Sequence, residues 1–191
     1  GPISVTPMDY PEMLYEPLVA SARAIGFPET PDANGAEQEG ISRLEASIGE
    51  GKRSSTARGY LHPVRRRQNL TIQTGAMVTR VLIENGRAVG VEYLSRGKLC
   101  IANAEGEVIL AGGAYNSPQI LMLSGIGPAD HLRSVGVKVI HDLKGVGENL
   151  SEHPNYVHIL RARGKLGLTR YLRVDRAAFN AARWMLRQDG I

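Results

Sequence analysis

A short apolar run followed by a pair of glycines is the feature that most constrains how this chain of 191 residues can fold. Residues 108–111 read Val-Ile-Leu-Ala, and Gly112 and Gly113 follow directly. An almost wholly apolar run of this length suits a strand buried on both faces, and the glycines end it. Such a strand needs cover on both sides, so the run predicts the buried centre of an α/β domain.

The residues after the glycine pair predict a helix whose start faces the turn. Ser117 followed by Pro118 favours a helix start, because serine accepts orphan N–H groups and proline suits the first turn. Gly125 predicts the end of this helix, and a second helix is expected from Pro128 to a stop at Gly136. The positive end of a helix dipole over a glycine turn can hold an anion, although many α/β proteins bind nothing at such a turn.

Residues 69–111 form the clearest β region. Strands are predicted at residues 70–74, 77–83, 87–93 and 98–102. Asn85-Gly86 predicts a tight hairpin turn between the second and third of them. Alternation of apolar and polar residues suits half-buried antiparallel strands, so we expect a meander that leads into the apolar run.

The two ends of the chain predict mainly short helices. A helix is expected over residues 17–25, with Gly26 as its stop, and another over residues 54–61, before Pro63. After Pro154 the pattern changes to a strand over residues 156–163. An amphipathic helix capped by Asp175 and ending at Gly190 follows.

Composition excludes several classes of function. The single cysteine, Cys100, rules out an internal disulfide and is read as a small core residue rather than a reactive thiol. The net charge of +4 suggests attraction to anions, but three arginines at residues 65–67 form the only tight basic run. With 5% aromatics and no stacking pattern, nucleic acid is a poor candidate partner. No run approaches the roughly 18 apolar residues of a membrane span.

Two stretches resemble one known family. Residues 113–127 read GAYNSPQILMLSGIG, which resembles the second signature of the glucose-methanol-choline (GMC) family of FAD-dependent oxidoreductases at each constrained position. Residues 145–153 read GVGENLSEH, which resembles that family's glycine-valine-glycine, asparagine-leucine and acid-histidine segment. Residues 51–61, GKRSSTARGYL, and the meander are similar to the family as well. Almost the whole chain therefore aligns with the middle of a GMC protein.

The resemblance implies a mixed α/β fold. It would be the central part of an FAD-binding fold with an antiparallel β-meander, followed by the start of the substrate-domain sheet. Residues 1–62 would form a substrate-side or lid segment with short helices, and residues 63–150 part of the FAD-binding domain. Residues 151–191 would begin the substrate-binding domain.

The resemblance also assigns residues to the cofactor. In the family, a valine of the first meander strand places its backbone against the adenine, and Val78 occupies that position here. The alanine-glycine end of the buried strand lies beside the ADP part of FAD, which points to Ala111, Gly112 and Gly113.

No residue of this chain is expected to be catalytic. The glycines at residues 125–127 and 145–147 lack the third glycine of the dinucleotide fingerprint. In the family, that fingerprint lies upstream of the matched part, and the histidine base that takes the alcohol proton lies downstream. Asn149 and His153 match positions near the flavin, with a structural role favoured for His153. The histidines do not have the spacing of a metal site.

The sequence thus predicts an internal fragment of an FAD-dependent oxidoreductase that acts on CH–OH groups, of the alcohol or choline dehydrogenase or oxidase type. The parent would use FAD and a small alcohol, with hydride transfer to the flavin, while the fragment alone would be inactive and bind FAD weakly or not at all. Two alternatives stay open: an FAD-containing hydroxynitrile lyase of the same family, and a non-catalytic folding core or binding module. We also expect a cytoplasmic location and self-association through exposed apolar surface.

Overall fold

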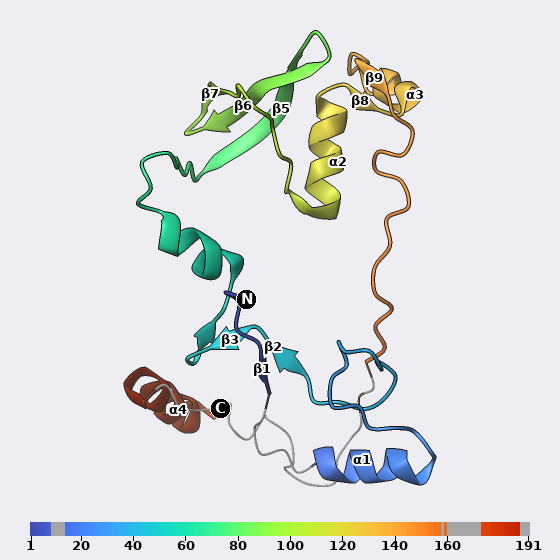
Figure 1. The fold of residues 1–191 in the computed structure, drawn as a ribbon, viewed down its shortest axis with the longest axis vertical. Coiled ribbons are helices and arrows are strands. Elements are labelled where there is room, and N and C mark those ends of the chain that lie inside the picture. The colour runs from blue at the N-terminus through green and yellow to red at the C-terminus, as the bar shows by residue number, and fades with distance from the viewer. Residues whose placement is uncertain (9–13, 158, 160–172, 188–191) are drawn as a thin grey trace. The chain divides into compact units, whose positions relative to one another are not determined.

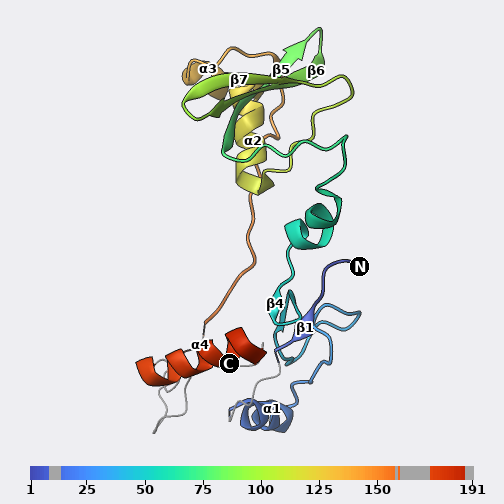
Figure 2. The same ribbon diagram turned by 90° about the vertical axis from the view of Figure 1, so that its left-hand side faces the viewer.

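The computed structural model describes residues 1–8, 14–157, 159 and 173–187. The chain divides into two compact units. One is Thr71–Val157, and the other combines Gly1–Leu70 with His158–Ile191. Figures 1 and 2 show the elements of both units in two views at right angles.

A three-stranded antiparallel sheet forms one part of the unit Thr71–Val157 (Figure 1). Its strands pair in the order β5 (Ala76–Glu84), β6 (Arg87–Ser95), β7 (Lys98–Asn103). Asn85 and Gly86 connect the first two strands with φ angles of 50° and 77°, as a two-residue hairpin turn requires. Three of the four strands predicted in this region, at residues 77–83, 87–93 and 98–102, and this turn are confirmed.

The helical part of the same unit follows the sheet in the chain. It comprises α2 (Gly113–Leu123), β8 (Ile126–Gly127), α3 (Ala129–Ser134) and β9 (His141–Asp142). Helix α2 packs against β5, and β8 pairs with β9 in parallel. The predicted second helix is confirmed, since Pro128 directly precedes α3 and Gly136 follows it with a φ of 74°.

The strands predicted at residues 70–74 and 108–111 are wrong. Neither run forms a strand, and Ile109 is 77% exposed. A strand needs a neighbour whose backbone groups bond to its own, and no described strand pairs with either run. The helix start predicted at Ser117 is also wrong, because α2 begins at Gly113 and holds Pro118 inside it.

The other unit is built from short elements. They are β1 (Thr6–Pro7) paired with β2 (Glu45–Ala46), α1 (Tyr15–Ala24), β3 (Ile48–Gly49) paired with β4 (Lys52–Arg53), the π-helical turn η1 (Ala57–Leu61), the 3-10 turn η2 (His62–Val64) and α4 (Val174–Arg187). The helix predicted over residues 17–25 is confirmed as α1. The helix predicted over residues 54–61 is present as η1, which ends at Leu61, and the separate turn η2 follows because proline is tolerated at the start of a new turn.

The predicted C-terminal elements are only partly covered by the structure. The strand predicted over residues 156–163 and the helix end at Gly190 lie largely outside the described residues. Helix α4 is present, but Asp175 lies inside its first turn rather than at its cap. The Asp175 carboxylate accepts hydrogen bonds from the Arg173 guanidinium at 3.2 Å.

The fold is a mixed α/β one with small antiparallel sheets, as the sequence predicts. Its described buried apolar side chains are few: Val19, Ala22, Val81, Ala129 and Leu132. Large apolar residues stay exposed elsewhere in the described chain, including Ile109 and most of α4. The two small cores hold their units together locally and leave much apolar surface uncovered.

Candidate functional site

Two glycines, Gly112 and Gly113, form the turn at the start of α2. Gly113 has a φ of 82°, and a Cβ added there would meet no atom within 4 Å. At Gly112, by contrast, an added Cβ would lie 3.0 Å from the Cβ of Asn116. The Gly112 N–H donates to the Ser117 Oγ at 2.9 Å, which closes the turn. Gly113 therefore needs to be glycine for its φ, and it faces open space.

The N-terminal end of α2 is free to receive an anionic group. No side chain caps this eleven-residue helix, and its first turn contains no acidic residue. Residues 111–116 are all exposed. The first N–H groups of a helix have no partner within it, and the helix dipole favours negative charge at this end. The residues present thus fit the phosphate-bearing part of a nucleotide.

Val78 lies on the outer strand of the sheet. It is half-buried in β5 and paired with Tyr93 of β6. Because β5 is an edge strand, no described strand covers its other side. Val78 can therefore offer backbone atoms to a planar group, and this position fits a contact through the main chain.

The second half of the signature, residues 124–127, has a structural role. Ser124 is 5% exposed, and its Oγ accepts a hydrogen bond from the Val81 N–H at 2.8 Å. The same hydroxyl donates to the Ile120 carbonyl at 2.6 Å. It joins the end of α2 to the edge of β5. Sequence reasoning missed Ser124, although its fixed place before Gly125 in the signature was a signal.

Gly125 cannot be any other residue without a rearrangement. It has a φ of 84°, and a Cβ would lie 2.4 Å from the Lys138 carbonyl oxygen. Its own carbonyl accepts from the N–H groups of Ile140 and His141 at 2.8 and 3.1 Å. This close approach lets β9 pair beside β8.

An aspartate distant in sequence caps α3. The Asp142 Oδ1 accepts from the Ala129 N–H at 3.0 Å, while Pro128, the residue at the cap position, supplies no side-chain acceptor. An acceptor at a helix start satisfies one of the orphan N–H groups. Asp142 therefore holds α3 beside the β8–β9 pair, a role that spacing in the sequence could not reveal.

A charged cluster joins the edge strand β5 to the central strand β6. Arg80 donates to both carboxylate oxygens of Glu92 at 3.1 and 2.8 Å, and the Thr79 hydroxyl donates to the same carboxylate at 2.8 Å. The hydrogen bond from Arg80, followed by that from Thr79, lowers the pKa of Glu92 below its ordinary value. The same pairing raises the pKa of Arg80. The cluster links β5 to β6.

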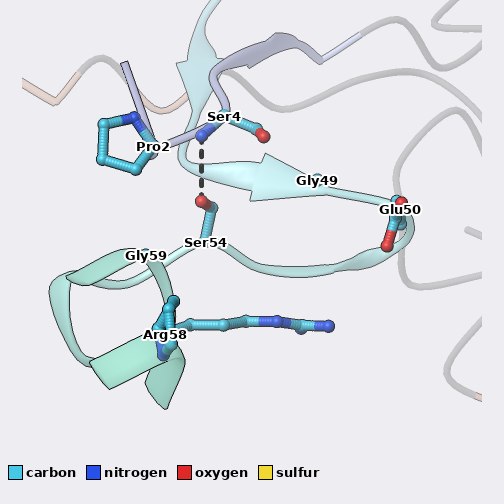
Figure 3. Close-up of a pocket in the computed structure, with 8 residues that line it drawn as sticks. Pro2, Ser4, Gly49, Glu50, Ser54, Arg58 and Gly59 are labelled. Carbon is cyan, nitrogen blue, oxygen red and sulfur yellow. Dashed lines mark hydrogen bonds between the residues drawn. The ribbon is translucent and has the colours of Figure 1, made fainter. Parts of the chain in front are cut away.

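Each unit contains an open cleft. In the unit Thr71–Val157, a cleft of about 600 Å³ lies between β5, the end of α2 and residues 137–140. In the other unit, a cleft of about 400 Å³ is lined by Glu50 and Arg58, and its wall is tied by a hydrogen bond from the Ser4 N–H to the Ser54 Oγ (Figure 3).

Cys100 and the histidines His62, His131, His141 and His153 lie within the described residues. His153 and His141 are exposed, and the His153 N–H bonds to the Glu152 carboxylate at 2.8 Å. Cys100 is half-buried rather than part of a core. Asn149 has a φ of 57°, a conformation that asparagine adopts more readily than most residues. Within the described residues, no three metal-ligating side chains come together.

Comparisons with known proteins agree with this arrangement. The family model described as GMC oxidoreductase matches residues 1–155, and the chain therefore belongs to that family. The mitochondrial choline dehydrogenase of Mus musculus is 47% identical over 153 residues, 80% of this chain and 26% of that protein. The oxygen-dependent choline dehydrogenase of Staphylococcus aureus strain MSSA476 is 37% identical over 190 residues, 100% of this chain and 33% of that protein.

Solved structures show the same fold. A variant of the Aspergillus oryzae RIB40 formate oxidase superposes with a TM-score of 0.89 at 27% identity, over 100% of this chain and 34% of its own. The chain thus spans about a third or less of the length of these relatives. Among the residues that the structure describes, no helix has the length and apolar character needed to cross a bilayer.

Proposed function

We propose that this chain is the central part of an FAD-dependent oxidoreductase that acts on CH–OH groups, and that it contributes the ADP-side half of the cofactor site. The observation that carries the proposal is the Gly112-Gly113 turn at the uncapped start of α2, within the family signature. A turn of this kind at a helix N-terminus suits phosphate oxygens. The match to the GMC family over residues 1–155 supports the reaction class.

Each proposed cofactor residue has a role that its position allows. Gly113 leaves space beside the first turn of α2, where a side chain would intrude on a ligand. Gly112 lets the chain pass close to Asn116, and exposed Ala111 precedes it in the approach to the helix. Val78 would contact the adenine through backbone atoms at the open edge of β5.

The reaction itself would need parts beyond this chain. Bound FAD would supply a hydride acceptor for oxidation of the alcohol. We propose that no residue of this chain is catalytic. Its residues bind and orient the ADP part of the cofactor, and a base elsewhere in the parent removes the hydroxyl proton.

Choline is the first substrate to test for the parent protein. A mitochondrial choline dehydrogenase is 47% identical, and an oxygen-dependent one 37% identical over nearly the whole chain.

The proposal also includes the division of the chain and its location. We propose a substrate-side or lid segment at residues 1–62, part of the FAD-binding domain at residues 63–150 and the start of the substrate-binding domain at residues 151–191. We also propose a cytoplasmic location. Cell fractionation with an antibody to this chain tests the location.

The test of the cofactor role compares two glycines with similar backbones. Gly113 and Gly136 have φ angles of 82° and 74°, and an added Cβ would meet nothing within 4 Å at either. In the full-length protein that carries this chain, Gly113→Ala should weaken FAD binding about tenfold or more, which corresponds to about 1.4 kcal/mol. Gly136→Ala should cost similar stability and leave FAD affinity unchanged.

Flavin fluorescence titration and thermal unfolding give the two readouts. A purified full-length protein without flavin absorbance and without affinity for added FAD would contradict the proposed function. Equal FAD affinity in the two variants would remove Gly113 from the site and leave the family membership intact.

A further inference from the structure

The two parts of the proposed cofactor half-site lie on different elements of one unit. Val78 belongs to β5, whereas Gly112 is the cap residue of α2 and Gly113 is its first residue. The chain connection alone does not fix the orientation of α2 relative to β5, because β6, β7 and an irregular segment separate them in sequence. A ligand that contacts both parts needs their relative orientation to be held by side chains.

One buried hydroxyl joins the two elements. Ser124 directly follows α2, and its Oγ accepts from the Val81 N–H, 43 residues away in sequence. Val81 is three positions along β5 from Val78. Because the Oγ also donates to the Ile120 carbonyl, the hydroxyl is held in place from the helix side. At 5% exposure, water cannot readily take over either bond.

Because α2 is long, a small tilt at Ser124 displaces the start of the helix by a larger distance. Eleven residues at about 1.5 Å each give a rod of about 16 Å, so a tilt of about 10° at Ser124 moves the helix start by about 3 Å. A shift of that size would separate the glycine turn from a phosphate group bound to it, since such hydrogen bonds span about 3 Å.

We propose that Ser124 is a positioning residue for the ADP part of FAD, acting through the orientation of α2 on β5. This inference rests on the proposed function. In this proposal, Ser124 itself contacts no atom of the cofactor. The hydroxyl fixes the orientation of α2, which begins at Gly113, on β5, the strand that carries Val78.

The experiment uses the full-length protein and three variants. Ser124→Ala removes the acceptor and leaves the Val81 N–H buried without a partner, and Ser124→Thr keeps a hydroxyl in place. Leu132→Ala is the stability control, because Leu132 is 1% exposed in α3 and makes no bond between α2 and β5. Each variant is titrated with FAD, with ADP as a competitor and with FMN, which lacks the adenylate.

We expect Ser124→Ala to weaken FAD and ADP binding about tenfold, in line with the loss of one buried hydrogen bond. FMN binding should stay unchanged, and Ser124→Thr should recover most of the affinity. Leu132→Ala should lower the melting temperature at least as much without a change in FAD affinity. If Ser124→Ala gives no soluble protein, Ser124→Cys, a weaker acceptor, replaces it in the same comparison.

Three results would overturn the inference. FAD affinity that falls equally in Ser124→Ala and Leu132→Ala would mean that the hydroxyl acts through stability alone. An equal loss for FMN and FAD would mean that Ser124 does not act on the ADP half. Wild-type protein that binds no FAD would overturn the proposed function together with this inference, whereas the first two results leave the proposed function standing.

Discussion

At the scale of single residues, two glycines that follow helices show how different the demands on the same backbone conformation can be. Gly26 follows α1 with a φ of 81°, and Gly125 follows α2 with a φ of 84°. A Cβ at Gly26 would meet nothing within 4 Å, whereas a Cβ at Gly125 would collide with the Lys138 carbonyl. Both end a helix, but only Gly125 also admits a neighbouring chain segment.

The pair gives a direct prediction about stability. Gly26→Ala should cost about 1 kcal/mol, the penalty of a left-handed conformation for a residue with a Cβ. Gly125→Ala should cost clearly more, about 3 kcal/mol or above, because the clash with backbone adds to the strain. Urea unfolding of the two variants against wild type measures both. Equal losses would show that the 138–141 segment moves aside without cost.

The Glu92 carboxylate should make stability depend on acid. Hydrogen bonds from Arg80 and Thr79 lower its folded-state pKa below the ordinary 4.5, so this contribution is complete above pH 4.5 and is lost as pH falls through the folded value. In Glu92→Gln, thermal stability should therefore decline less steeply below pH 4.5 than in wild type. Glu84→Gln, at the end of β5, is the control and should follow the wild-type profile. Parallel profiles for wild type and Glu92→Gln would contradict the assignment.

At the scale of elements, local signals in the sequence were sufficient to predict an element that depends only on its own residues. The hairpin around Asn85-Gly86 formed as predicted, because the turn residues and the alternating strands favour the same register. The apolar run at residues 108–111 did not form a strand, since a strand depends on a partner that the described chain does not provide. Helix α2 began before Ser117 because the Ser117 hydroxyl bonds to the Gly112 N–H instead of starting the helix.

The residues of the candidate site also differ in whether the sequence could predict them. The Gly112-Gly113 turn was visible in the sequence, because paired glycines mark backbone that other residues cannot adopt. Ser124 and Asp142 act on N–H groups of Val81 and Ala129, which are distant in sequence, and no periodicity predicts such bonds. The signature marked Ser124 as constrained without revealing what it holds.

Helix α3 should depend on the Asp142 carboxylate. Asp142→Ala removes the acceptor for the Ala129 N–H and should destabilise the unit Thr71–Val157 by about 1 kcal/mol, the usual cost of a lost helix cap. Asp142→Asn keeps an oxygen acceptor and should recover part of that loss. Amide hydrogen exchange at residues 129–134 measures the local effect. Unchanged protection in Asp142→Ala would show that packing of buried Leu132 holds the helix alone.

At the scale of the whole molecule, exposed apolar surface stands out. The buried apolar side chains of the described chain are small in number, while Ile109, Phe179, Met185 and Leu186 are between 64% and 85% exposed. The chain spans about a third or less of the length of the relatives it matches. Uncovered apolar surface of this kind favours association between copies.

We therefore predict that the isolated chain self-associates, with the apolar side of α4 as a main contact. Phe179 and Leu186 lie on that side of the helix, and both are exposed. Replacing both by serine should shift sedimentation at high concentration toward monomer, because each buried large apolar side chain contributes about 1.5–3 kcal/mol. Ala181→Ser, on the opposite side of α4, should leave association unchanged. A wild-type chain that sediments as a monomer at all concentrations would show that its exposed apolar residues are too scattered to form a contact.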